Sequence, residues 1–209
     1  MIDPGKLRPI DVNRPWYNKA LDLLPSSPQK ILELGAGAGE FADRLKTLGY
    51  KVICVEGSPV YLKRLKKMGF STKKADLNKS LPLPAGTFDG VLSLEVIEHL
   101  IEADNFLSEV YRVLKPKGWL VISTPNIAWW GYRLFALMGQ PPKKEGYHLR
   151  FFTHNTLTQL LKKHGFRIKG SNSFTTVPFI NRYLSFRFYP TVKHWPNLLA
   201  QDLVFLCRK

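Results

Sequence analysis

The segment Ile31-Leu-Glu-Leu-Gly-Ala-Gly-Ala-Gly-Glu-Phe41 contains an apolar run that ends in an acid and is followed by three glycines at alternate positions. The apolar run predicts a buried strand over residues 29–34, and the residues after the glycines predict a helix over 40–48. A turn built from residues without a Cβ atom lets the backbone approach a ligand closely. The segment therefore predicts a strand, a turn and a helix that together bind a nucleoside.

The spacing of the glycines indicates which kind of nucleoside fits. The dinucleotide pattern Gly-x-Gly-x-x-Gly would place its third glycine at position 40, where this chain has Glu40. A carboxylate at a helix N-terminus lies where a pyrophosphate needs positive potential. We therefore expect a nucleoside cofactor without phosphate groups rather than a nicotinamide dinucleotide.

Outward from this segment, strand and helix patterns alternate along the chain, and such alternation predicts a parallel sheet. The expected strands cover 29–34, 51–56, 70–75, 88–94 and 119–123, with two more near 166–171 and 202–208. The expected helices cover 14–24, 40–48, 59–68 and 103–114, and one more helix is capped by Thr153 and ended by Gly165.

Polar residues follow several of these strands in a recognisable order. Glu56 ends the second apolar run, about 20 residues past the glycine turn, where an acid takes the hydroxyls of a ribose. Asp76 follows the third strand, and Glu95-Val-Ile-Glu-His99 follows the fourth. With these residues in place, the segment 31–41 resembles motif I of the class I S-adenosylmethionine-dependent methyltransferases, and 88–100 resembles their fourth strand and the turn after it.

This resemblance implies an α/β fold with a Rossmann-like, seven-stranded, mostly parallel sheet, helices on both faces and an antiparallel C-terminal edge strand. It also implies S-adenosylmethionine as cofactor. In the matching positions, Glu56 binds both ribose hydroxyls, Asp76 accepts from the adenine amine, and the turn after the fourth strand holds the methionine part. The cofactor-binding residues that it implies are Glu33, Gly35, Ala36, Gly37, Gly39, Glu56, Gly57, Ser58, Asp76, Leu77, Leu94 and Glu95.

Methyl transfer to a hydroxyl requires alignment of the acceptor oxygen and a base that removes its proton. The candidate bases are Glu98 and His99 after the fourth strand and His148 after the fifth. Both stretches resemble the quinone-precursor O-methyltransferases, and on that basis His99 and His148 meet across the pocket. We rank His148 above His99 as the base, although a histidine at a helix start also serves as a cap or packs in the core. We predict no metal site.

The positive charge of the chain is concentrated in its C-terminal part. Residues 1–125 hold 18 Lys and Arg against 14 Asp and Glu, whereas residues 126–209 hold 13 against 2, so that +11 of the net +15 lies in the later part. That part also holds 16 of the 26 aromatic residues. Cations with aromatic rings suit an anionic membrane surface or RNA, while solubility alone also explains a positive charge excess.

The segment 127–138 favours the first of these partners, because it is dominated by large apolar side chains and has a single cation, Arg133. Such a surface covers an acyl or prenyl chain better than it follows a phosphate backbone. The alternatives for this segment are a plain lid or core segment, and a nucleic-acid surface.

For the activity of the whole chain, we expect methylation of a small or lipid-like acceptor at oxygen. The alternatives are an RNA-directed methyltransferase and a cofactor-binding module without catalysis.

Length and composition add four further expectations. A chain of 209 residues is most economically one domain, which we divide into an N-terminal helical segment (1–28), a cofactor core (29–125), a lid or substrate insertion (126–152) and a C-terminal helix with edge strands (153–209). Cys54 and Cys207 fall in apolar strands and are expected to be buried and reduced. No leader pattern and no membrane span is recognisable. We expect a cytoplasmic protein, with a peripheral membrane contact as an alternative, and its oligomeric state stays open.

Overall fold

The computed structural model describes residues 14–25, 29–141, 148–176 and 189–209. The N-terminal residues, on which the expected absence of a leader depends, lie outside this description. Residues 177–188, which belong to the basic and aromatic C-terminal part, also lie outside this description. No helix among the described residues is both long enough and apolar enough to cross a membrane. Cys54 and Cys207 are buried and unpaired, as expected from their apolar strands.

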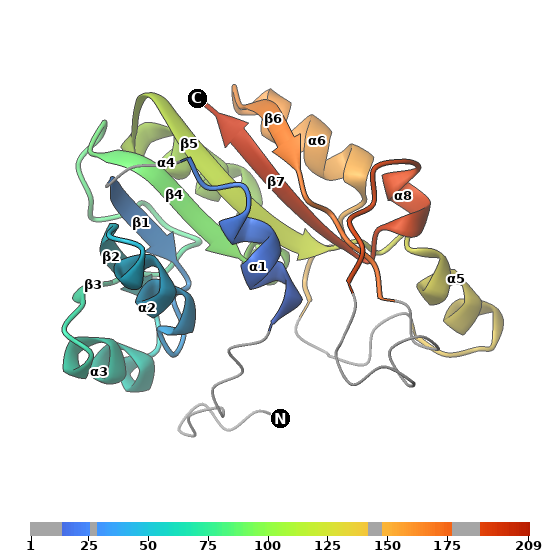
Figure 1. Ribbon diagram of the computed structural model, residues 1–209, viewed down its shortest axis with the longest axis horizontal. Coiled ribbons are helices and arrows are strands. Elements are labelled where there is room, and N and C mark those ends of the chain that lie inside the picture. The colour runs from blue at the N-terminus through green and yellow to red at the C-terminus, as the bar shows by residue number, and fades with distance from the viewer. Residues whose placement is uncertain (1–13, 26–28, 142–147, 177–188) are drawn as a thin grey trace.

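A seven-stranded sheet forms the centre of the molecule, in the order β3-β2-β1-β4-β5-β7-β6 (Figure 1). The strands are β1 (Lys30–Leu34), β2 (Lys51–Glu56), β3 (Ser71–Lys74), β4 (Phe88–Leu94), β5 (Leu114–Pro125), β6 (Arg167–Ser171) and β7 (Asp202–Arg208). Strands β1 to β5 are parallel, and β7 pairs antiparallel with both β5 and β6. The predicted fold class is confirmed, with the antiparallel strand β7 lying one position inside the edge strand β6.

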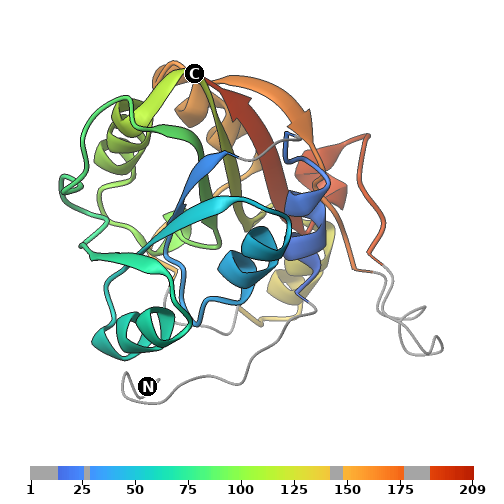
Figure 2. The same ribbon diagram turned by 60° about the vertical axis from the view of Figure 1, so that its left-hand side comes forward.

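Helices cover both faces of the sheet (Figures 1 and 2). One face carries α1 (Pro15–Leu21), α2 (Glu40–Thr47) and α3 (Pro59–Lys67), whose apolar sides pack against one buried cluster that includes Phe41, Leu45 and Leu65. The other face carries α4 (Ala103–Val113) and α6 (His154–Lys163), which pack against a second cluster through Phe106, Leu107, Leu157 and Leu161. Apolar side chains at helical spacing on each of these helices explain the two layers.

Three features of the chain differ from the expectation. Strand β5 begins at Leu114 rather than at 119, because the pairing with β4 jumps from Phe88↔Leu114 to Gly90↔Trp119 and leaves the intervening residues as a bulge. Two helices, α5 (Trp130–Leu137) and α8 (Pro196–Leu199), were not predicted. The first helix ends at Leu21 rather than 24, four residues before Pro25, whose ring disfavours helical backbone at Leu24.

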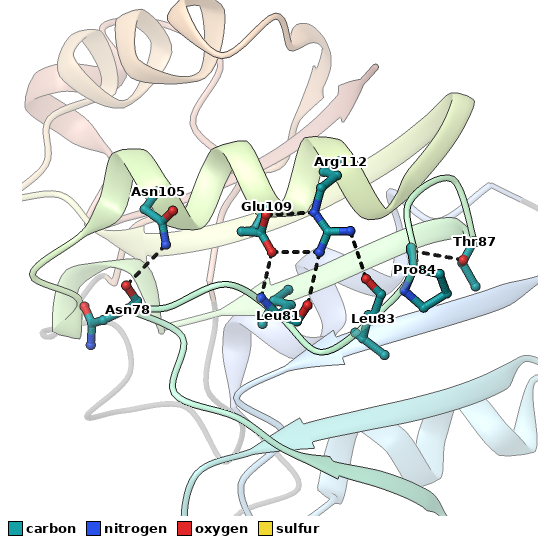
Figure 3. A network of polar contacts seen from close by, with 8 residues as sticks. All are labelled: Asn78, Leu81, Leu83, Pro84, Thr87, Asn105, Glu109 and Arg112. Carbon is teal, nitrogen blue, oxygen red and sulfur yellow. Dashed lines mark hydrogen bonds and ion pairs between the residues drawn. The ribbon is translucent and has the colours of Figure 1, made fainter.

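A polar network fixes the long connection between β3 and β4 to α4 (Figure 3). The Glu109 carboxylate accepts from Nε and Nη2 of Arg112 at 2.8 and 2.7 Å and from the Leu81 amide at 2.6 Å. Arg112 also donates to the carbonyls of Leu81 and Leu83. The connection therefore has a defined path although it contains no regular structure, and its first residues can form one wall of a site.

Candidate functional site

The site lies where the direction of chain progression reverses, between β1 and β4. Ligands of open α/β sheets bind beyond the carboxyl ends of the strands at such a reversal. Gly35 follows β1 in the left-handed region (φ 73°), and a Cβ atom built on it would lie 2.6 Å from Cγ2 of Val96 in the turn after β4. The two turns thus contact each other, and this contact requires glycine at position 35.

Glu56, at the end of β2, is bound by the backbone of the glycine turn. Its Oε2 accepts from the Gly37 amide at 2.8 Å, and its Oε1 accepts from the amides of Gly57 and Ser58 at 2.8 and 2.9 Å. A carboxylate has about four acceptor positions, so three are occupied here and one remains on Oε2. Glu56 is therefore held rigidly, but one amide has to move away before both hydroxyls of a ribose can bind to it.

Glu33, the next-to-last residue of β1, is buried just before the glycine turn. Burial, together with the negative charges of Glu56 and Glu40, raises its pKa to about 8. Its Oε2 has no hydrogen-bond partner among the residues that the structure describes. Because a buried polar atom without a partner costs free energy, this carboxyl suits a ligand that brings a donor or a positive charge.

Asp76 and Glu95 occupy turns at the same edge of the sheet. Asp76 is exposed, and its Oδ1 accepts from the backbone and side-chain nitrogens of Asn78 at 3.0 and 3.2 Å, which lowers the pKa of Asp76. Glu95 has positive φ (56°), and its Oε1 accepts from the Ser123 hydroxyl at 2.8 Å. Asp76 therefore stabilises its own turn, whereas Glu95 joins the turn after β4 to β5, and their contacts with a cofactor stay predictions.

The remaining residues of the expected cofactor set line these same turns. Ala36 and Gly39 are buried, Ser58 and Leu77 are half-buried, and Gly57 is exposed. Leu94, the last residue of β4, is half-buried and packs against the cluster on the α2 face. The structure thus gathers the turns after β1, β2, β3 and β4 at one edge, in the order that the sequence implied.

Glu98, His99 and His148 come together on the β4–β5 side of this edge. Glu98 and His99 lie in a short 3-10 helix (Ile97–His99), and the rings of His99 and His148 meet edge to face with centroids 4.9 Å apart. Nε2 of His99 lies 3.8 Å from Oε1 of Glu98, whose side chain is buried. All three side chains offer one ligating atom within 4.8 Å of the others, which is the spacing of a metal-binding group.

A small pocket opens beside this group. Its lining combines the polar residues Glu98, His148 and Arg150 with Tyr132 and the apolar side chains of Pro125, Ile127 and Phe151. Pro125 ends β5, Ile127 lies in the segment that leads into α5, and Phe151 lies just before α6, so residues of the expected insertion 126–152 line this pocket. Their role toward an acceptor stays a prediction.

Sequence reasoning missed the side chains that hold these parts in place. Thr124 donates to Oε2 of buried Glu98 at 3.1 Å, and Arg150 donates to the carbonyls of Leu100 and Ile101. These bonds end on backbone oxygens or on a buried carboxylate, so no residue spacing in the sequence signals them.

The first helix contributes a further contact at the opposite side of the site. Tyr17 donates to Oε2 of Glu40 at 3.0 Å and packs on Phe41, while Arg14 lies 3.9 Å from the same carboxylate. Tyr17 is therefore packed against the start of α2.

Comparisons with known proteins show what the chain is similar to. Residues 10–169 match a family model described as a methyltransferase domain. A protein of Mycolicibacterium smegmatis, described as a probable S-adenosylmethionine-dependent methyltransferase, is 32% identical over 143 residues, which are 68% of this chain and 53% of that protein. The chain thus spans about half the length of that relative.

Two further proteins are similar over most of their length. The ubiquinone biosynthesis O-methyltransferase of Bartonella tribocorum is 24% identical over 200 residues, which are 83% of this chain and 80% of that protein. A structure of a methyltransferase from Thermotoga maritima, described as a possible histamine N-methyltransferase, superposes with a TM-score of 0.69 at 25% identity, covering 92% of this chain and 89% of the other.

Proposed function

The chain belongs to the class I S-adenosylmethionine-dependent methyltransferases, and from this premise we propose that it transfers the methyl group of S-adenosylmethionine to an oxygen atom of a small or lipid-like acceptor. The observation that carries the proposal is the group formed by Glu98, His99 and His148 beside a partly apolar pocket. This group provides basic atoms where the acceptor would lie.

The residues on the cofactor side fit S-adenosylmethionine. Bound there, it supplies a methyl group on a positively charged sulfur that an oxygen nucleophile can displace. Glu56 would orient the ribose, and Glu33 would face the positively charged methionine end, because its carboxyl is buried beneath the glycine turn. A Cβ atom on Gly37 would meet no atom within 4 Å, so this residue leaves open space at the turn for a ligand.

His148 is proposed as the residue that removes the proton from the acceptor oxygen, with His99 in contact to take part or to replace it. Glu98 would orient this pair, because its carboxylate is buried, fixed by Thr124 and 3.8 Å from His99. A carboxylate beside an imidazole stabilises the imidazolium that forms when the ring accepts a proton. The protein therefore has the parts for general-base catalysis in addition to alignment.

An oxygen acceptor is supported by residues and by one of the relatives. The end of β4 and the turn after it carry Ser93-Leu-Glu-Val96, whereas methyltransferases that act on amino groups of nucleic acids or glutamine commonly carry an Asn or Asp-Pro-Pro-Tyr tetrad there, so exocyclic base nitrogens are disfavoured as acceptors. The Bartonella relative is an O-methyltransferase by name. The Thermotoga structure is described with a nitrogen acceptor, so an amine is the main competing acceptor class.

The lipid-like character of the acceptor is supported by α5, which lies beyond the end of β5 (Figure 1). This helix and its flank expose Trp130, Leu134, Phe135, Leu137 and Met138, and Leu149 and Phe151 are exposed beside the pocket. Exposed apolar residues in one region mark a binding surface more often than scattered ones do. We propose that this surface covers an apolar acceptor tail, and that the protein works in the cytoplasm against the membrane surface where such an acceptor resides.

Incubation of the protein with methyl-labelled S-adenosylmethionine and fractionated cell extract tests the proposal. We expect label in the organic phase with the unchanged protein, a loss of at least tenfold for His148→Ala, and no loss for His194→Ala, whose side chain is exposed elsewhere. Label that enters the nucleic-acid phase would show the RNA-directed alternative instead. Cofactor binding without label in any phase would show a binding module that does not catalyse.

A further inference from the structure

We propose that Arg150 binds an anionic group, either a carboxylate or a phosphate, that the methyl acceptor carries in addition to the oxygen that is methylated. Arg150 is half-buried and lines the pocket together with Glu98 and His148. A guanidinium stays positively charged in proteins, so Arg150 places a permanent cation at the wall of this pocket. The inference rests on the proposed function, because it takes this pocket as the place of the acceptor.

The hydrogen bonds of Arg150 leave one edge of its guanidinium available. Nε donates to the carbonyls of Leu100 and Ile101, each at 3.1 Å, and Nη2 also donates to Ile101. Nη1 and the second N–H of Nη2 have no hydrogen-bond partner in the part of the chain that the structure describes. These N–H groups form the end of the guanidinium fork, which fits both oxygens of a carboxylate or phosphate.

The positive charge of Arg150 is not neutralised by a neighbouring acid. Its hydrogen bonds end on neutral carbonyl oxygens, and it forms no ion pair with any acid among the described residues. Arg112, by contrast, is paired with Glu109 at 2.7 Å. The carboxylate of Glu98 also lines the pocket, but its oxygens lie against Thr124 and His99. Because a half-buried charge without a counter-ion has lost hydration without compensation, an anion in the pocket is favoured.

The backbone around Arg150 is fixed on both sides. The amides of Leu149 and Arg150 donate to the Glu98 carbonyl at 2.9 and 3.0 Å, and the Ile127 amide donates to the Phe152 carbonyl at 2.9 Å. These bonds join the segment to the turn after β4 and to the end of β5. The guanidinium is therefore preorganised, and an arriving anion does not have to order the chain that carries it.

The surroundings of Arg150 indicate what else the acceptor contains. Pro125, Ile127 and Phe151 line the same pocket, and Leu149 is exposed beside it. An anionic group at Arg150 and an apolar body against these side chains describe an amphiphilic acid, with its hydroxyl near His148. A cationic amine would be repelled by the guanidinium. The site thus disfavours the competing class of acceptor.

Calorimetry with matched alkyl compounds tests this inference without any turnover. The probes are decanoate, decyl phosphate, decanol and decylamine, added to the full-length protein saturated with S-adenosylhomocysteine. We expect at least one of the two anions to bind about tenfold or more tightly than decanol, and decylamine to bind most weakly. The ratio of anion affinity to decanol affinity is compared between variants, because general damage to the pocket affects both compounds.

Arg150→Gln should bring this ratio close to that of a protein without preference. Arg150→Lys should keep part of the preference, because the charge remains while the fork is lost. The matched control is Arg133→Gln in α5. Arg133 is exposed, its Nε also donates to a backbone carbonyl, that of Ala128 at 3.1 Å, and it does not line the pocket. This control should leave the ratio unchanged.

The inference is overturned if the anions bind no better than decanol, or if Arg133→Gln removes the preference while Arg150→Gln retains it. Thermal unfolding shows whether each variant is folded. If Arg150→Gln binds none of the probes, Arg150→Lys decides the question. A remaining preference for an anion then supports the inference, and decanol binding without any preference contradicts it.

The anion site and the proposed function can fail separately. Labelled product extracted into organic solvent from the acidified reaction should move into water at alkaline pH if it carries an acid. If the labelled product stays in the organic phase, the inference about Arg150 is wrong and the function stands. If the anionic probes bind through Arg150 and no acceptor is methylated, the anion site stands and the function is wrong.

Discussion

Binding of S-adenosylmethionine is predicted to release a proton from Glu33. Burial first, and then the charges of Glu56 and Glu40, raise the pKa of this carboxyl to about 8, so that about nine of ten molecules carry the proton at pH 7. A ligand with an ammonium and a sulfonium group next to this residue favours the charged carboxylate. Binding should therefore release up to about 0.9 proton at pH 7 and about half a proton at pH 8.

Isothermal titration calorimetry measures this proton directly. The apparent binding enthalpy is determined in buffers that differ in ionisation enthalpy, and the slope gives the number of protons exchanged. Glu33→Gln is the matched variant, because an amide has the shape of the protonated carboxyl and cannot release a proton. The difference in slope between the two proteins isolates Glu33 from groups on the ligand. Equal slopes at pH 7, or a difference that grows above pH 8, would refute the reasoning.

The same pKa shift predicts how stability depends on pH without ligand. A carboxyl whose pKa rises from 4.5 in the unfolded chain to about 8 in the folded protein contributes its full stability below pH 4.5 and loses it as pH rises toward 8. The loss amounts to about 5 kcal/mol at most. Urea unfolding at pH 5 and pH 9 should therefore show a steeper decline for the unchanged protein than for Glu33→Gln, and parallel declines would count against a buried neutral carboxyl.

Three further changes have defined outcomes. Gly37→Ala and Gly49→Ala each place a Cβ atom at a residue with left-handed backbone and no other atom within 4 Å, so each should lower the free energy of unfolding in urea by about 1–2 kcal/mol. Only Gly37→Ala should also weaken cofactor binding in calorimetry. Equal effects of the two variants on binding would contradict the placement of the cofactor at the glycine turn. Glu109→Gln removes the charged acceptor of the network in Figure 3 and should lower the free energy of unfolding by about 1–2 kcal/mol, and an unchanged midpoint would show that the network is dispensable. Leu137→Ser changes a side chain that is 86% exposed, so it should leave the melting temperature unchanged and reduce sedimentation with anionic liposomes, and undiminished sedimentation would argue against the α5 surface.

The sheet and its helices could be predicted because their signals are local. The ends of β1, β2 and β4 each combine an apolar run with a turn residue, and the helix after Thr153 has both its cap and its terminating Gly165 in the sequence. The helix α5 could not be predicted, since Trp129 at its N-cap position makes no side-chain cap bond and the helix is apolar on most sides. Its existence depends on packing rather than on local signals.

The candidate site was predicted in its residue types and in the meeting of His99 with His148, which the resemblance implied. The bonds that hold His148 there could not be predicted, because they join the Glu98 carbonyl to two backbone amides and have no sequence signal. In the same way, Glu56 could be identified as a ribose ligand by resemblance, but its three bonds to backbone amides follow only from the path of the glycine turn.

The position of β7 between β5 and β6 has a consequence for how the protein folds. Strand β6 comes earlier in the chain but has no place in the sheet until β7 has paired with β5. Until then the side of β5 that later pairs with β7 is an open sheet edge, which can pair wrongly with another chain. Molecules in which β7 has not yet paired with β5 should therefore be the most prone to aggregate.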